Sequence, residues 1–226
     1  MRRREDVEDS VIPEKNSGLK RFFYIIIAVL LLPFTLNLFA SEGDSVAIRK
    51  KFQYFFLESL RQKKLGNYAE AADNLFRCHN LDKNNSVLYS ELANLNANLG
   101  MAKNAIYNME RAVALSPGNT HYKETLAQYY YNTEQYDKAA GLYKELVVDD
   151  KNKKNLYHYL LASIYTTTGQ NDLAVKEWDA LEEEVGINDK ITLEKFKLYR
   201  ALNDDKKAFK EVDKLIKAYP RETSYP

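Results

Sequence analysis

Five alanines recur at an almost constant spacing along this chain of 226 residues. They are separated by 34, 34, 35 and 34 residues and are Ala71, Ala105, Ala139, Ala174 and Ala208. A period of 34 residues is typical of two short helices joined by tight turns, and one such pair is too thin to bury its own apolar face. Because stacked pairs bury that face against one another, we expect an all-α solenoid that presents a binding surface.

Alignment on the alanines divides most of the chain into five repeat units. They cover residues 52–85, 86–119, 120–153, 155–188 and 189–222. The remaining parts are a charged tail (1–21), an apolar segment (22–40), a linker (41–51) and the start of a further unit (223–226). Each unit is predicted to hold two helices with a turn between them.

The turn position is glycine in three units and another residue in two. Gly66, Gly100 and Gly169 suit a left-handed turn because glycine accepts positive φ at little cost. Glu134 and Asn203 occupy the same position in the third and fifth units, and Asn tolerates that conformation better than Glu.

The unit pattern resembles the tetratricopeptide repeat. The second unit carries it on Tyr89, Leu92, Ala93, Gly100, Ala105, Ala112 and Pro117. The third unit supplies Leu126, Ala127, Tyr130, Tyr136, Ala139 and Tyr143, and the fourth supplies Leu161, Ala162, Tyr165, Gly169, Ala174 and Trp178. The resemblance implies a right-handed α-solenoid of about five tetratricopeptide helix pairs, preceded by one N-terminal transmembrane or signal helix.

The first and last units depart from this pattern. Glu58 and Lys195 stand where the repeat has leucine, and Phe196 stands where it has a small residue. The acidic run of Glu182, Glu183 and Glu184 points in three directions on a helix, so we interpret it as a solvated helix end.

The apolar segment 22–40 carries no charge, and its 19 residues approximately span a bilayer core as a helix. Basic residues precede it, whereas Glu42 and Asp44 follow it, which predicts a cytoplasmic N-terminus and repeats on the outer side. Two interpretations stay open: a retained single-pass anchor, or a signal peptide cleaved near Ala40. Either one places the repeats outside the membrane, in the periplasm of a bacterium.

Composition argues against several classes of function. Lys and Arg total 33 against 32 Asp and Glu, so no basic field favours nucleic acid. The single cysteine, Cys78, falls at a small core position and is predicted to be a buried, inert thiol. The chain has no phosphate loop, dinucleotide fingerprint or paired-histidine metal motif, so we expect no catalytic residue, no metal site and no cofactor.

The family resemblance implies that the first helix of each unit lines a concave groove, which holds an extended or helical peptide of a partner. The register places polar, amide-rich and aromatic side chains there, which suit contact with a peptide backbone. The predicted groove residues are Ser90, Asn94, Asn98, His121, Glu124, Gln128, Tyr131, Asn132, Tyr159, Ser163 and Thr167.

Cations are predicted at the two ends of this groove, where they could receive acidic groups. They are Lys63 and Lys64 in the first unit and Lys190, Lys197 and Arg200 in the fifth. The carboxylate clamp of chaperone-binding family members is incomplete here, because Ser90, His121 and Thr125 replace its basic residues. We therefore expect no binding of cytosolic heat-shock protein tails.

The last predicted helix leaves apolar residues with nothing after them in the sequence to cover them. They are Val212, Leu215, Ile216 and Tyr219. This ending indicates either a piece of a longer repeat protein or a docking end, and the second case predicts self-association through the C-terminal helix.

The leading functional hypothesis is a non-enzymatic adaptor, tethered to a membrane or exported, that binds partner proteins in cell-envelope assembly or secretion. Two alternatives stay open: a membrane-anchored cytosolic adaptor that recruits an enzyme or protease, and a self-associating structural protein.

Overall fold

The computed structural model describes residues 44–220. The charged tail, the apolar segment 22–40 and the start of a further unit lie outside this range. The chain divides into two units, Met1–Tyr54 and Phe55–Pro226. The described part of the first unit, residues 44–54, is helical.

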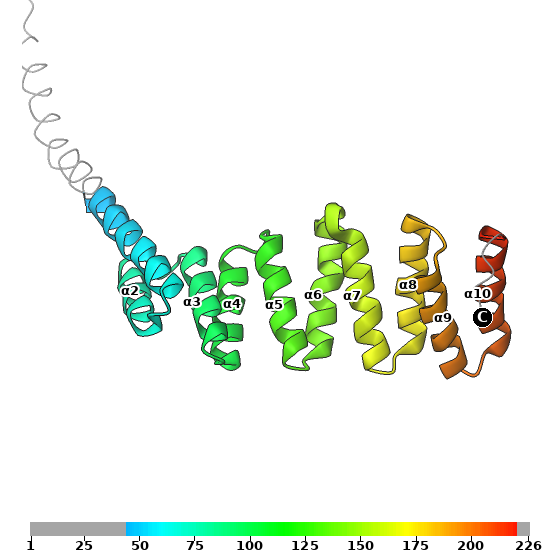
Figure 1. Cartoon of the computed structure of the whole chain (residues 1–226). Coiled ribbons are helices and arrows are strands. Elements are labelled where there is room, and N and C mark those ends of the chain that lie inside the picture. Colours follow the sequence, from blue (N-terminus) through cyan, green and yellow to red (C-terminus); the bar gives the residue numbers. More distant parts are fainter. Residues whose placement is uncertain (1–43, 221–226) are drawn as a thin grey trace, which may run out of the picture. The chain divides into compact units, whose positions relative to one another are not determined.

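The second unit consists of helices that follow one another in pairs (Figure 1). Residues 55–64 are helical and precede the first labelled helix. The helices after them are α2 (Tyr68–Leu81), α3 (Ser86–Asn98), α4 (Ala102–Leu115), α5 (Thr120–Asn132), α6 (Tyr136–Asp149), α7 (Lys154–Thr167), α8 (Asn171–Val185), α9 (Asp189–Ala201) and α10 (Asp205–Ala218), with a 3-10 turn, η1 (Lys151–Lys153), before α7.

Each helix from α3 to α9 packs against the helix before it and the helix after it. Within the pairs, α3 packs on α4, α5 on α6, α7 on α8 and α9 on α10, and between the pairs α4 packs on α5, α6 on α7 and α8 on α9. This arrangement confirms the all-α fold of paired helices. In the described range, no helix combines the length and the apolar character that crossing a membrane requires.

One turn geometry ends the first helix of every pair. Gly66, Gly100 and Gly169 have φ of 81°, 72° and 71°, and Glu134 and Asn203 adopt φ of 60° and 58° at the same position. In each turn the next amide donates to a carbonyl five residues earlier, for example from Gln135 N to Tyr130 O at 2.9 Å. This is the helix-ending motif that places its penultimate residue in the left-handed region. Glu134 therefore adopts a conformation that glycine reaches without strain.

The recurrent alanines lie in the core, as their spacing predicts. All five are 1% exposed or less, and larger side chains such as Tyr143 and Tyr157 fill the space around them. A small residue on a facing helix lets two helices approach closely. Cys78 is also fully buried, and this burial raises the pKa of its thiol to about 11, which keeps the thiol protonated at neutral pH.

A buried cluster of charges joins the last three helices. Lys195 of α9 is 0% exposed, and its Nζ lies 2.7 Å from Asp179 and 2.9 Å from Glu182, both on α8, and 2.9 Å from Glu211 on α10. Burial by itself lowers the pKa of Lys195, but its hydrogen bonds to the three carboxylates outweigh that effect and raise the pKa. Lys195 thus occupies the leucine position of the repeat as a paired cation.

The same cluster corrects the interpretation of the acidic run. Glu182 is mostly buried and pairs with Lys195, so it does not belong to a solvated helix end. Glu184 pairs with Lys154 at 2.6 Å, and Glu183 is exposed at the surface. The three residues do point in different directions, but one of those directions is the core.

Candidate functional site

A pocket of about 260 Å³ opens between α7 and α9, the first helices of two successive pairs. Its lining is Tyr159, Ser163, Thr166, Thr167, Trp178, Lys190 and Glu194. Tyr159, Ser163 and Thr167 are predicted groove residues, so the structure gathers three of them in one hollow. We call this hollow the α7–α9 pocket.

Helical spacing explains why α7 presents these side chains together. Ser163, Thr166 and Thr167 follow Tyr159 by four, seven and eight residues, which places them on one face of a helix. The hydroxyls of Thr166 and Thr167 donate to the carbonyls of Ala162 and Ser163 at 2.8 and 2.9 Å. Both oxygens keep lone pairs with which they can accept a hydrogen bond from a ligand.

Aromatic rings form one wall of the α7–α9 pocket. The rings of Tyr159 and Trp178 meet edge to face, with centroids 5.7 Å apart and an interplanar angle of 80°. Lys190 Nζ lies 4.5 Å from the centroid of Tyr159, within the range of a cation–π contact. Trp178 is 4% exposed, and its indole N–H has no acceptor in the part of the chain that the structure describes.

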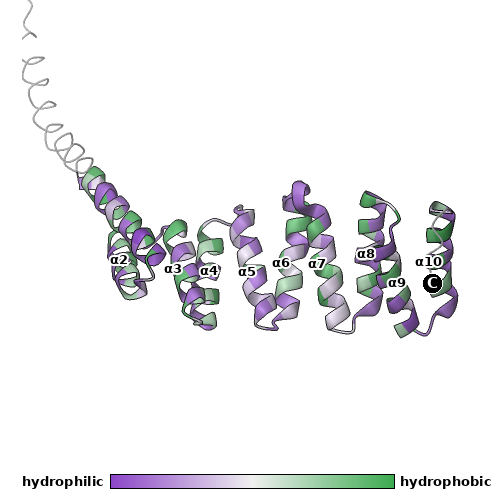
Figure 2. Cartoon of the chain, viewed as in Figure 1, coloured by the Kyte–Doolittle hydropathy of each residue, from purple (hydrophilic) through white to green (hydrophobic). Residues whose placement is uncertain are grey.

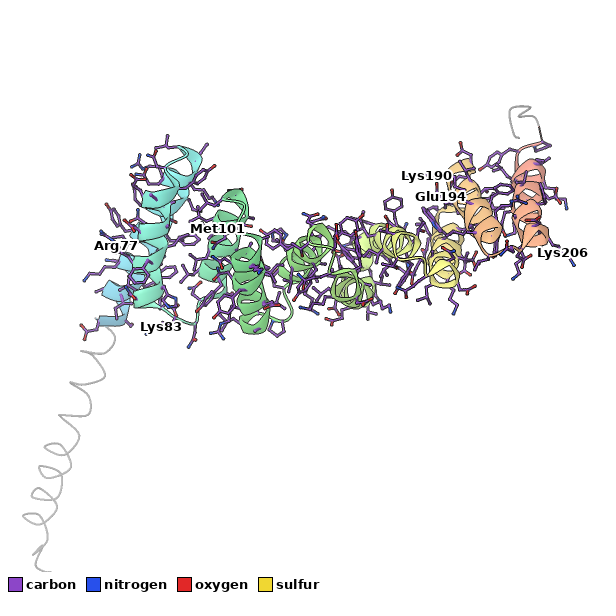
Figure 3. The ribbon with its side chains drawn as sticks, turned by 90° about the horizontal axis from the view of Figure 1, so that it is seen from below. Arg77, Lys83, Met101, Lys190, Glu194 and Lys206 are labelled. Carbon is purple, nitrogen blue, oxygen red and sulfur yellow. The ribbon has the colours of Figure 1, made fainter. Side chains whose placement is uncertain are left out.

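Lys190 and Glu194 supply the charges of the pocket and lie close together on α9 (Figure 3). Glu194 accepts a hydrogen bond from Lys197 at 2.9 Å, so its charge is already balanced. Lys190 has no carboxylate within ion-pair distance among the described residues, and its contact is with the Tyr159 ring. The pocket therefore keeps one cation available to a ligand.

The predicted residues of the third unit lie on α5, which Figure 2 shows with many hydrophilic positions. Glu124 pairs with Lys153 at 2.8 Å, and Gln128 donates to Asn132 at 2.8 Å. Tyr131 meets Tyr136 edge to face at 5.6 Å, while His121 is exposed at the start of the helix. These side chains interact with neighbouring residues on α5, α6 and η1.

The predicted residues of the second unit lie on α3 and differ in exposure. Asn94 Oδ1 accepts a hydrogen bond from the hydroxyl of Tyr129 on α5 at 3.1 Å, so it joins two units. Asn98 is exposed near the end of α3. Ser90 is only 8% exposed, so it offers little surface to a partner.

Most of the cations expected at the two ends already have carboxylate partners. Lys63 pairs with Glu91, Lys197 with Glu194, and Arg200 with Asp205 at 2.6 Å. An acidic ligand would have to compete with these carboxylates for the three cations. Sequence spacing alone could not show this, because two of the partners lie on other helices or beyond a turn.

The α7–α9 pocket is also lined by Trp178 and Glu194, which the sequence does not predict at the binding surface. Glu194 follows Lys190 by four residues, a spacing that could have placed both on one face of a helix. Trp178 belongs to the repeat pattern of the fourth unit and is buried, yet it also lines the pocket. Within residues 44–220, no group of three or more acidic, histidine or cysteine side chains could hold a metal ion.

Comparisons with known proteins match the repeats. The sequence family described as "Anaphase-promoting complex, cyclosome, subunit 3" matches residues 98–177, from the end of α3 into α8. No curated protein matches the chain significantly.

Solved structures share the helical arrangement at low sequence identity. The MamA protein has a TM-score of 0.60 and 14% identity, over 78% of this chain and 96% of its own. MamA 41-end from Desulfovibrio magneticus RS-1 has a TM-score of 0.57 and 18% identity, over 77% and 98%. YrrB, a TPR protein with an unusual peptide-binding site, has a TM-score of 0.57 and 17% identity, over 74% and 86%. The chain thus has the fold of a tetratricopeptide-like repeat protein.

Proposed function

We propose that this protein is a non-enzymatic scaffold that binds an extended segment of a partner protein along the first helices of its repeats. The observation that carries the proposal is the α7–α9 pocket, because it lies between two first helices and contains three predicted groove residues. Proteins of this fold serve in general as scaffolds, and the similar structure of YrrB is described as having a peptide-binding site.

The size of the pocket favours a peptide side chain over a cofactor. Sites for drug-sized ligands and cofactors usually measure about 300 to 1,000 Å³. At about 260 Å³ the α7–α9 pocket is smaller, and its lining combines hydroxyls, two aromatic rings and two charged groups. Such a mixed lining suits one side chain of an extended segment whose remaining residues lie along the neighbouring first helices.

Site-specific photo-crosslinking tests this proposal. A photoreactive phenylalanine analogue placed at Thr167, which is exposed in the pocket, should crosslink a single segment of a partner in living cells. The matched control is the same analogue at Tyr107, which is 61% exposed on α4, a second helix. Crosslinks from Tyr107 to the same segment, with none from Thr167, would move the binding surface to the second helices.

We further propose that residues 22–40 tether the chain to a membrane or direct its export, and that the repeats act on the outer side of a bacterial inner membrane in envelope assembly or secretion. Support comes from the uncharged 19-residue segment and from the basic residues before it. Protease added to sealed cells, to spheroplasts and to lysed spheroplasts tests the location. Degradation in spheroplasts agrees with the proposal, whereas degradation only after lysis would favour the cytosolic adaptor.

A further inference from the structure

The charge balance in the α7–α9 pocket indicates what kind of side chain it receives. The lining carries one cation, Lys190, and one carboxylate, Glu194, and Lys197, outside the lining, pairs with Glu194. Subtracting that pair leaves the single positive charge of Lys190 beside the hollow. A basic side chain would enter next to this cation and compete with Lys197 for Glu194, whereas an acidic side chain would complete the balance.

The donors around the pocket agree with an acidic occupant. Lys190 carries an ammonium group whose nearest partner is the face of the Tyr159 ring. Trp178 lines the pocket, but its indole N–H is fully buried and is not among the donors that an occupant can reach. Ser163 adds a hydroxyl, which can donate to a carboxylate.

We propose that the α7–α9 pocket receives an aspartate or glutamate side chain of the bound segment, and that Lys190 forms an ion pair with its carboxylate. The inference rests on the proposed function, because it names the chemistry of one residue in the segment that the first helices bind. The pocket places the pair beside two aromatic rings and partly out of solvent, so the pair is less screened than one on an open helix.

The same segment would lie against α5 and α3, where the predicted site is polar and uncharged except for Glu124, which pairs with Lys153. The α7–α9 pocket is then the one place along these described first helices where charge selects the ligand. We expect the acidic residue to occupy a fixed place in every segment that binds, with broad tolerance elsewhere.

A displayed library of random peptides tests this chemistry on the full-length chain, held in non-ionic detergent micelles because of the apolar segment 22–40. Selected peptides should share an aspartate or glutamate at one place. Lys190→Gln should weaken their binding about tenfold, the size of one charge-assisted hydrogen bond. In that variant, changing the acidic residue of the peptide to its amide should cause no further loss of affinity. Lys206→Gln, on the exposed side of α10, is the matched control (Figure 3).

A pocket-filling variant, Thr167→Trp, separates the two levels of the proposal, with circular dichroism confirming that it folds. Suppose that peptides lose binding to Thr167→Trp but show no acidic preference, or that they bind Lys190→Gln as well as the wild type. Either result would overturn the acidic-residue inference and leave the scaffold function standing. A library that yields no peptide sensitive to Thr167→Trp would overturn both.

Discussion

Replacing Lys195 by methionine is expected to loosen the last helix pair selectively. Lys195 is 0% exposed, and the variant leaves Glu211, 6% exposed at its side chain, and Glu182, 14% exposed, without their central cation. Removing one partner of a buried ion pair costs about 3 to 5 kcal/mol, because the other charge stays buried without compensation.

The expected cost lies near the lower end of this range, at about 3 kcal/mol. Asp179 is 47% exposed at its side chain, so its pair with Lys195 behaves partly like a surface pair and contributes little. Lys214 remains 3.0 Å from Glu211 and 3.6 Å from Glu182, so it compensates part of the lost charge. The double variant Lys195→Met, Glu211→Met should recover at least about 1 kcal/mol relative to the sum of the two single changes.

Native-state hydrogen exchange is the appropriate measurement, because repeat arrays unfold in parts and a single unfolding free energy can hide a local change. Protection should fall in α9 and α10 of Lys195→Met and stay unchanged in α5 and α6. Lys206→Met, an exposed lysine on α10, serves as the control and should change protection by less than about 0.5 kcal/mol. Equal protection in Lys195→Met and the wild type, or a loss spread evenly over all helices, would refute the reasoning.

The pH dependence of this effect follows from the sign of the pKa shift. The folded-state pKa of Lys195 is raised above its ordinary value of 10.5, so the folded protein binds this proton more tightly than the unfolded chain. The stabilisation is complete below the unfolded value and is lost as the pH rises through the folded value. The difference between the wild type and Lys195→Met should therefore be constant between about pH 6 and pH 9 and shrink only at strongly alkaline pH.

Three further predictions concern the turns, the core and the pocket. Glu134→Gly should leave the free energy of unfolding unchanged or raise it by up to about 1 kcal/mol, because it removes the strain of a positive φ. Gly100→Ala should lower the free energy of unfolding by about 1 kcal/mol, and thermal melts compare the two variants. Ala139→Leu should lower it by about 1 to 3 kcal/mol through overpacking, which denaturant titration measures. Trp178 is the only tryptophan of the chain and lines the α7–α9 pocket. Its fluorescence should therefore shift when a peptide enters this pocket and stay constant when a peptide binds elsewhere.

The helix pairs could be predicted because every level of the sequence agrees on them. The alanine spacing sets the period, and the turn position is left-handed in all five turns, including those with Glu134 and Asn203. A local backbone requirement of this kind depends on residues close in sequence, so it can be read from one chain. The departures at Glu134 and Lys195 did not break the pattern. The hydrogen bonds of the turn hold Glu134, and ion pairs to α8 and α10 hold Lys195.

The ion pairs of the charged residues could not be predicted in the same way, because their partners lie on other helices. Lys63 pairs with Glu91 of the next unit, and Lys195 reaches residues on both of its neighbouring helices. The C-terminal helix shows the same limit. Leu215 was expected to be uncovered, but it is 4% exposed, so Leu215→Glu would disrupt the core and would not test self-association. Ile216, at 44% exposure, is the surface residue with which that prediction can be tested.

The unusual features of α9 belong together physically. Ile191, Lys195 and Leu198 form one buried stripe along the helix, and Lys190 and Glu194 lie on the neighbouring stripe that lines the pocket. A leucine in place of Lys195 would hold α9 by contacts that tolerate small rotations, whereas the ion pairs to α8 and α10 depend on direction. We therefore expect Lys195 to fix the rotation of α9 and, with it, where Lys190 meets the ring of Tyr159. The departure from the repeat pattern inside the core therefore supports the placement of the charge at the proposed binding pocket.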